Sequence, residues 1–297
     1  MSDDQVFQWL LDVDRIWLTQ FEGVEPFRSS VQWSKEKDVQ AALSQLPSDE
    51  STKVLKFYRH TDAKLCLGSC LLKRRAISDF CNVPWADVAI GVDSNRKPCY
   101  SPKEATGKKL EFNVSHHGTL VALVGCPGNN VKLGVDVVRM SWEKDYDKVM
   151  KEGFESWATT YEMVFSPREM RDISEFIPPN CRDSTEVIKA KLRHFYAFWC
   201  LKEAFVKMTG EALMASWLKR LEFRDVDVPE CSTEGSWGRI CRNVEIYFDD
   251  ERVEGVLLQI QSFCKEYMIA TCASSAVVVE PFKVLSADQL FPSIIQP

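Results

Sequence analysis

The segment Val131-Lys132-Leu133-Gly134-Val135-Asp136-Val137-Val138 indicates the fold of this chain. Its residues alternate as in a β-strand, which places Gly134, Asp136 and Val138 on one face. Asp136 is therefore a carboxylate among apolar residues, where a charge must be paired or must bind a metal. We expect Gly134 to remove side-chain bulk that would block an approaching ligand. An aspartate that only makes a turn or a local hydrogen bond remains the alternative.

A long helix is expected from about Thr185 to Thr209, ending at Gly210. It contains the stretch Trp199-Cys200-Leu201-Lys202-Glu203-Ala204-Phe205-Val206-Lys207. The spacing places Glu203 on the stripe that faces the core, so this acid needs a partner. Lys207, one turn further on, offers an ordinary helix-surface pair as the alternative to a binding role.

The rest of the chain mixes helical and strand patterns. Helices are predicted over 51–80, with a break near His60, over 141–160, and from Ser166, where Ser166-Pro167-Arg168-Glu169 forms a helix cap. Strands are predicted over 88–92, 110–115, 120–124, 132–138, 221–223, 244–248, 256–260 and 267–273. The pattern predicts an α+β fold with two mixed halves, residues 1–128 and 129–297.

Charge and composition exclude several functional classes. The 297 residues carry 37 bases and 43 acids, a net charge of −6 that argues against general nucleic-acid binding. No apolar stretch approaches the roughly 20 residues that span a bilayer, so no membrane association is expected. A local excess of bases lies in the helix over 51–75, which includes Lys53. Taken by itself, that excess indicates a solvated helix face more readily than a binding surface.

The eleven cysteines include no Cys-x-x-Cys pair, and we interpret them as reduced thiols of a cytoplasmic protein. Cys66 and Cys70 lie one helical turn apart, which fits plain packing or a metal or redox role.

The strand Glu111-Phe112-Asn113-Val114-Ser115-His116-His117 ends in a Ser-His step. A hydrolase triad is disfavoured there, because consecutive strand residues point to opposite faces and no third acid is evident. The strand end does offer a hydroxyl, an imidazole and backbone amides to an anion.

The chain carries five motifs in order: Asn95-Arg96-Lys97-Pro98, Phe112-Asn113-Val114-Ser115-His116, Gly134-Val135-Asp136-Val137, Phe165-Ser166-Pro167-Arg168-Glu169 and Trp199 to Lys207. Together they resemble the broad-specificity 4′-phosphopantetheinyl transferases of the surfactin-synthetase-activating type, and most of all those of filamentous fungi. The resemblance covers roughly residues 46–273. It implies two α/β halves related by pseudo-twofold symmetry, with coenzyme A and Mg²⁺ in the cleft between them.

The resemblance also implies an activity and its partners. Such an enzyme moves the phosphopantetheine arm of coenzyme A to a serine of an acyl or peptidyl carrier protein and releases adenosine 3′,5′-bisphosphate. This is a holo-[acyl-carrier-protein] synthase reaction. The carriers expected belong to fatty acid, polyketide and nonribosomal peptide synthases and to aminoadipate reductase. A monomer is expected.

Roles transfer residue by residue from the resemblance. Asp136 and Glu203 match the metal ligands, Glu203 is the expected acceptor of the serine proton, and Lys207 completes the catalytic group by neutralising the departing bisphosphate. The implied coenzyme A contacts are Lys53, Arg96, Lys97, Asn113, Ser115, His116, Lys202 and Lys207.

One departure concerns the metal. Many relatives have a third carboxylate where this chain has Val138, so a water is expected to replace that ligand. Two other functions compete with the transferase. One is a non-catalytic module that binds coenzyme A or carrier proteins, and the other is an acyltransferase with His116 as its base.

Overall fold

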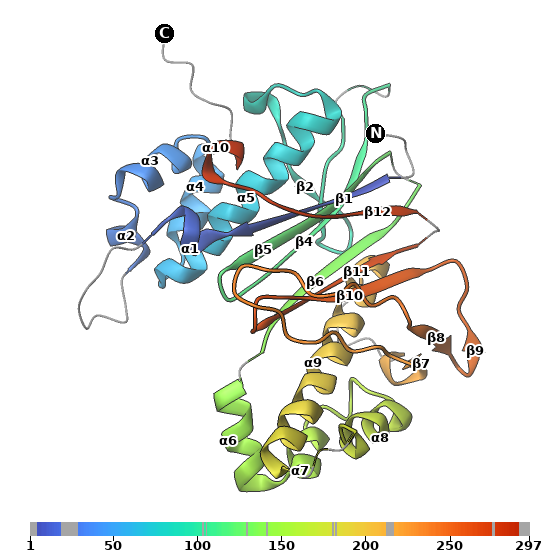
Figure 1. Cartoon of the computed structure of the whole chain (residues 1–297). Helices are drawn as coiled ribbons and strands as arrows, with labels where there is room; N and C mark the ends of the chain where they lie inside the picture. Colours follow the sequence, from blue (N-terminus) through green and yellow to red (C-terminus); the bar gives the residue numbers. More distant parts are fainter. Residues whose placement is uncertain are drawn as a thin grey trace. The chain divides into compact units, whose positions relative to one another are not determined.

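The computed structural model describes residues 5–18, 29–102, 104, 106–128, 130–140, 142–179, 181, 183–211, 217–274 and 277–290. The chain forms two compact units, residues 1–131 with 277–297 and residues 132–276 (Figure 1). Helices and sheets occur in both units, which confirms the predicted mixed α+β class. The pseudo-twofold relation between the halves stays a prediction.

The first unit is built on a four-stranded sheet in the order β12-β1-β5-β4. β1 (Gln5–Asp12) pairs with β5 (Leu120–Pro127) in antiparallel fashion, and β5 pairs likewise with β4 (Leu110–His117). On its other side β1 runs parallel to β12 (Val278–Val284), blue beside red in Figure 1. The tail was expected in the second half, but it belongs to the first unit because β12 extends this sheet.

Helix α5 (His60–Cys81) packs on the sheet of the first unit and buries Leu67, Leu71 and Leu72 against it. The predicted helix break is confirmed, since α4 (Ser48–Leu55) ends shortly before α5 begins. The predicted strand over 88–92 is reduced to the two-residue β2 (Gly91–Val92), which pairs with β3 (Pro98–Cys99). The shorter elements are α1 (Val13–Ile16), α2 (Ser30–Trp33), α3 (Lys37–Leu43), the 3₁₀ helix η1 (Trp85–Asp87) and α10 (Ala287–Leu290).

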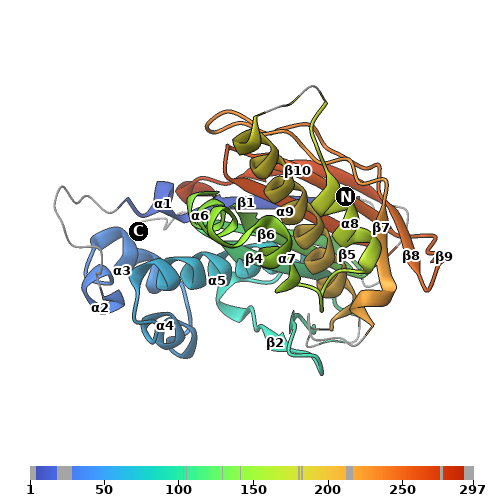
Figure 2. The same cartoon turned by 90° about the horizontal axis from the view of Figure 1, so that it is seen from below.

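The second unit has an antiparallel sheet in the order β10-β11-β6. Its strands are β10 (Leu257–Phe263), β11 (Tyr267–Ala273) and β6 (Leu133–Arg139). The long helix α9 (Ser184–Thr209) packs on this sheet (Figure 2). α6 (Trp142–Glu152), α7 (Phe154–Thr159) and α8 (Pro167–Glu175) are the other helices of this unit, with the 3₁₀ helix η2 (Leu218–Arg220) and a small sheet of β7 (Leu221–Arg224), β8 (Glu245–Phe248) and β9 (Glu251–Arg252).

Local sequence explains where the helices of the second unit begin and end. The helix expected over 141–160 is interrupted at Gly153, whose φ of 82° separates α6 from α7. The cap predicted at Ser166 is confirmed as a full capping box with Glu169. α9 begins after Asp183, whose carboxylate accepts two backbone N–H groups, and ends at Gly210 in the left-handed conformation.

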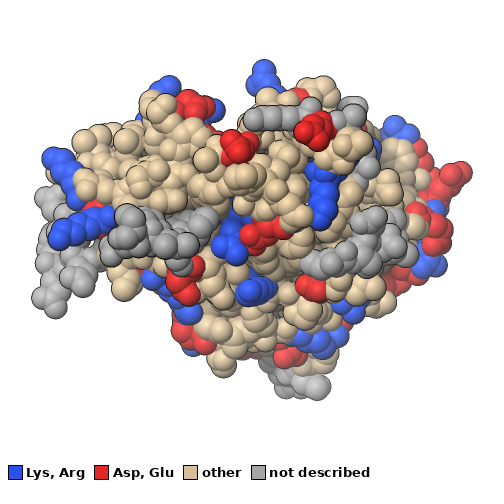
Figure 3. Space-filling view, turned by 90° about the horizontal axis from the view of Figure 1, so that it is seen from above, with Lys and Arg blue, Asp and Glu red and all other residues tan. Residues whose placement is uncertain are grey.

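Three sequence-based expectations can be compared with this fold. All eleven cysteines are free thiols. No helix within the described ranges has both the length and the apolar composition needed to cross a bilayer. Acidic and basic side chains are interspersed over the face seen in Figure 3, so the net negative charge is not gathered into one patch on that face.

Candidate active site

Asp136 lies in the middle of β6, opposite Ala270 of β11, and is only 5% exposed. Gly134 lies on the same face of β6, and its surroundings show which element that face packs against. A Cβ atom on Gly134 would lie 2.0 Å from the carbonyl oxygen of Ala204 and 2.5 Å from the backbone nitrogen of Met208, both in α9. Asp136, two residues further along the strand, therefore also faces α9. Gly134 was expected to admit a ligand, but the structure shows that it lets α9 approach the sheet.

Glu203 and Lys207 stand on α9 one turn apart. The Lys207 Nζ atom lies 2.6 Å from Oδ1 of Asp136, so the lysine bridges helix and strand. Among the described residues, no hydrogen bond or ion pair holds the Glu203 carboxylate, which is partly buried. The structure therefore brings all three predicted catalytic residues together within the second unit.

The electrostatics of this group are unusual for a carboxylate. Burial raises the pKa of Glu203 to about 7, the negative charge of Asp136 adds to the rise, and Lys207 opposes it. Near neutral pH the carboxyl group is therefore poised between its two protonation states. A cation at this point would favour the ionised form.

The donor set fits a hard divalent cation. Asp136 and Glu203 supply carboxylate oxygens, the ligands that Mg²⁺ prefers, and the single charge of Lys207 does not balance both acids. Val138 supplies no ligand, because its side chain is 4% exposed and packs in the hydrophobic core of this unit. The two carboxylates are thus the residues that would hold the metal.

Lys202 was expected to contact coenzyme A, and the structure corrects this. Its side chain is fully buried, with Nζ 2.9 Å from Oε2 of Glu169 and 3.0 Å from the carbonyl oxygen of Leu218, and it also donates to the carbonyl of Leu221. These three partners use the donors of an ammonium group, so none is left for a ligand. Lys202 is a structural residue that ties α9 to η2 and β7.

Glu169 has a structural role beyond the helix cap that its sequence motif predicts. One carboxylate oxygen accepts the Ser166 backbone N–H at 2.9 Å, as a cap should, and the other accepts the Phe223 N–H at 2.9 Å. The pair with Lys202 is entirely buried. The signal available in the sequence was the buried stripe of α9, which includes Lys202.

In the first unit, alternation along β4 separates the predicted ligand contacts. Asn113 and Ser115 are each 6% exposed and share one face of the strand. His116 is exposed and lies on the opposite face, with Phe112, whose ring belongs to the core beneath α5. The structure therefore groups Asn113 with Ser115, and His116 apart from them.

The loop that carries Arg96 and Lys97 joins β2 to β3. Asp93 organises it, because one carboxylate oxygen accepts the backbone N–H groups of Asn95 and Lys97. Arg96 is exposed and takes a left-handed conformation with φ 63°. Lys97 reaches back to β4, with Nζ 2.6 Å from Oε1 of Glu111.

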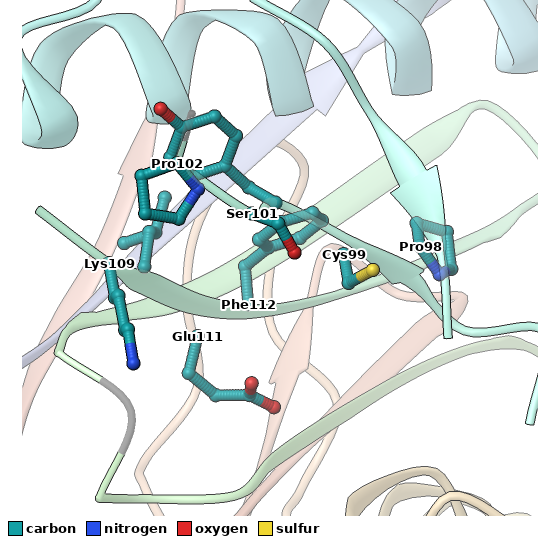
Figure 4. Close-up of a pocket in the computed structure, with 9 residues that line it drawn as sticks. Pro98, Cys99, Ser101, Pro102, Lys109, Glu111 and Phe112 are labelled. Carbon is teal, nitrogen blue, oxygen red and sulfur yellow. The ribbon is translucent and has the colours of Figure 1, made fainter. Parts of the chain in front are cut away.

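A hollow of about 220 Å³ adjoins this loop. Pro98, Cys99 and Ser101 form one side of it, and Lys109, Glu111 and Phe112 of the β4 region lie across from them (Figure 4). Lys109 and Glu111 extend from the same strand region in this view. Glu111, the ion-pair partner of Lys97, thus lines a small polar cavity in the first unit.

The basic stretch over 51–75 has two kinds of residue. Lys53 is exposed on α4, as a ligand contact would require. Lys64 and Arg74, by contrast, are each 1% exposed and form ion pairs with Asp14 at 2.7 Å and Glu50 at 2.8 Å. Part of the local basicity is therefore internal to the fold.

Two family models match the chain. The model "4'-phosphopantetheinyl transferase, N-terminal" matches residues 31–128, and "4'-phosphopantetheinyl transferase superfamily" matches residues 132–272. The chain is 33% identical to the 4'-phosphopantetheinyl transferase of Aureobasidium melanogenum over 94% of both chains. It is 35% identical to 4'-phosphopantetheinyl transferase 1 of Fusarium mangiferae, over 91% of this chain and 87% of the relative.

A more distant mammalian relative is the L-aminoadipate-semialdehyde dehydrogenase-phosphopantetheinyl transferase of Mus musculus, 26% identical over 61% of this chain and 53% of its own. An α+β fold, a carboxylate pair beside a lysine and these matches define a class of group-transfer enzyme. The chain belongs to the 4′-phosphopantetheinyl transferase family.

Proposed function

We propose that this protein transfers the 4′-phosphopantetheine arm of coenzyme A to a serine of an acyl or peptidyl carrier domain, releasing adenosine 3′,5′-bisphosphate. This is the reaction of a holo-[acyl-carrier-protein] synthase. The observation that carries the proposal is the cluster of Asp136, Glu203 and Lys207, in which Lys207 is paired with Asp136 and the charges of both residues act on the nearby Glu203 carboxyl group. A non-catalytic binding module would have no need of that arrangement.

Each residue has a defined part in the reaction. The serine Oγ forms a bond to the phosphorus that bears pantetheine, and the bond from that phosphorus to the bridging oxygen breaks. No described residue donates a hydrogen bond to the Glu203 carboxylate, and this carboxylate accepts the serine proton directly or through water. The electron pair of the broken bond leaves with adenosine 3′,5′-bisphosphate, whose charge Lys207 stabilises. Asp136 positions Lys207 through their ion pair.

Asp136 and Glu203 would also hold Mg²⁺, because carboxylate oxygens are the ligands that this cation prefers. When bound, the cation would neutralise pyrophosphate charge that otherwise repels the nucleophile.

We further propose that the first unit binds the nucleotide end of coenzyme A. Its candidate contacts are Lys53, Arg96, Lys97, Asn113, Ser115 and His116. Support comes from the hollow of about 220 Å³ lined by Glu111, the ion-pair partner of Lys97, and from the buried polar pair Asn113 and Ser115. On this proposal residues 1–128 supply nucleotide contacts and the segment from 129 supplies the metal ligands and the catalytic helix.

The partners proposed are carrier domains of fatty acid, polyketide and nonribosomal peptide synthases and of aminoadipate reductase. The names of relatives that act on L-aminoadipate-semialdehyde dehydrogenase support the last of these. A cytoplasmic location and a monomeric state are proposed with them.

The test is a reaction with apo carrier domain, coenzyme A and Mg²⁺, followed by chromatography of the nucleotides. Equal consumption of coenzyme A and formation of adenosine 3′,5′-bisphosphate, both dependent on the carrier serine, are expected. Binding of coenzyme A without its consumption would instead identify a non-catalytic module. Movement of an acyl group alone would identify an acyltransferase.

A further inference from the structure

The second unit contains a hollow of about 970 Å³ that the proposed reaction does not use. Its walls come from the first half of α9 between Glu186 and Arg193, from the segments around Pro178 and Cys231, and from the turn between β10 and β11. Small-molecule sites in proteins have volumes of about 300–1,000 Å³. Arg193 precedes Glu203 by ten residues, about 15 Å along the helix, so this hollow is distinct from the carboxylate cluster.

Arg193 is the principal charged group of this hollow. Its guanidinium donates to the carbonyl oxygen of Pro229, with Nε at 2.7 Å, and it contacts the sulfur atoms of Cys231 and Met140. No carboxylate within the described ranges pairs with it. Burial lowers the pKa of Arg193, and the neighbouring Cys231 and Glu230 oppose the shift without forming an ion pair with it.

The other charges of the lining leave a positive balance. Glu186 is paired with Lys189 at 2.9 Å, and Glu266 is paired with Arg139 at 2.9 Å. Lys265, at the turn between β10 and β11, has no ion pair with any described residue. Both acids are therefore neutralised, whereas Arg193 and Lys265 keep their charges.

The remaining surface of the hollow is mainly apolar. Pro178 and Ala190 present apolar surface, and Cys181 and Cys231 contribute thiols. The hydroxyl group of Ser232 already donates to two backbone carbonyls. A ligand that matches this lining has one anionic group and an apolar body.

We propose that this hollow is a binding site for a small amphipathic organic anion. Its anionic head lies against the Arg193 guanidinium and near Lys265, and its apolar body lies against Pro178 and Ala190. The ligand is a hydrocarbon with an anionic head group, either a carboxylate or a phosphate monoester. The experiment below distinguishes these two head groups.

The probe is 8-anilinonaphthalene-1-sulfonate, an anion with an aromatic body whose fluorescence rises in apolar surroundings. The titration uses the full chain with saturating adenosine 3′,5′-bisphosphate, so that the proposed nucleotide site does not bind the probe. Wild-type protein is expected to show saturable binding. Arg193→Gln should weaken it about tenfold, the value of one charge-assisted contact. Lys265→Gln should weaken it about threefold, as expected for an exposed charge.

Lys219→Gln is the matched control, since Lys219 is an exposed lysine of the same unit outside this lining. The affinity of this variant for the sulfonate probe should equal that of the wild type. The uncharged analogue N-phenyl-1-naphthylamine should bind more weakly than the sulfonate. Octanoate and octyl phosphate should each compete with the probe, and the better competitor identifies the head group.

Three results would overturn the proposal: equal affinity in wild type and Lys265→Gln, equal binding of the charged and uncharged probes, or no competition by either octyl compound. If Arg193→Gln fails to fold, Lys265→Gln and Arg193→Lys still decide it. Arg193→Lys keeps the positive charge and should retain most of the affinity for the probe. Complete loss of probe binding in Arg193→Lys, with thermal stability unchanged, would contradict a role for the charge.

Discussion

Replacing Lys202 by methionine tests the buried ion pair that anchors the catalytic helix. The change keeps much of the side-chain volume but removes an ammonium group that pairs with Glu169 at 2.9 Å and donates to two backbone carbonyls. Both side chains are fully buried, so the Glu169 carboxylate would keep two backbone N–H donors and lose its counter-ion. Burial already raises the pKa of Glu169 and lowers that of Lys202, while their mutual attraction opposes both shifts.

The expected cost follows from that geometry. Removing one partner of a buried pair destabilises a protein by about 3–5 kcal/mol, because the remaining charge is left uncompensated. For a unit the size of residues 132–276, each kcal/mol of destabilisation lowers the midpoint of thermal unfolding by about 2–4 °C. The midpoint of Lys202→Met should therefore lie about 6–20 °C below that of the wild type. The double variant Lys202→Met with Glu169→Gln should recover a substantial part of this loss, since no buried charge remains.

The assay is urea and thermal unfolding followed by tryptophan fluorescence, for the two single variants and the double variant. Lys189→Met is the matched control, because this lysine of the same helix pairs with Glu186 at the exposed surface, and little change is expected. Wild-type stability in Lys202→Met, or a double variant no more stable than Lys202→Met alone, would refute the assignment of Lys202 to a structural pair.

Three further outcomes are expected. Gly134→Ala should destabilise the second unit by about 2 kcal/mol or more and lower kcat, because its Cβ would overlap the α9 backbone at Ala204; unchanged unfolding would contradict that packing. Burial lowers the pKa of His194, so the unfolded chain binds a proton more readily. Stability should therefore fall as the pH drops below about 6.5 in the wild type and less so in His194→Gln, and parallel pH profiles would disprove this. Lys97→Ala should weaken coenzyme A about tenfold to a hundredfold in calorimetry, and equally weaken 3′-dephospho-coenzyme A only if it meets the pyrophosphate; no change for either ligand would remove Lys97 from the site.

Features set by neighbouring residues could be predicted from the sequence. The capping box at Ser166 and Glu169 depends on residues three apart, and the alternation that buries Asp136 depends on residues two apart. The period of α9 likewise placed Glu203 on a partly buried stripe. These patterns are local, so no knowledge of the fold was needed.

Features that depend on distant segments were missed. Periodicity indicates that Lys202 is near the core, but its partner Glu169 precedes it by 33 positions, and nothing local distinguishes an internal ion pair from a ligand contact. The role of Gly134 depends on the approach of α9, whose backbone is about 70 residues away in the chain. β1 and β12 pair across almost the whole sequence, which explains why the tail was assigned to the wrong half.

Intact-mass measurement of an apo carrier domain shows directly whether this protein transfers phosphopantetheine. The carrier is incubated with coenzyme A, Mg²⁺ and either the wild-type protein or Glu203→Gln, which keeps the shape of the side chain and removes its basic oxygen. We predict that the wild type adds the mass of one phosphopantetheine to the carrier, that a carrier with its serine replaced by alanine gains nothing, and that Glu203→Gln is slower by about 10²-fold or more at unchanged thermal stability. An unmodified carrier with the wild-type protein would contradict the proposed transfer, and equal rates for Glu203→Gln and the wild type at saturating Mg²⁺ would contradict the role of Glu203.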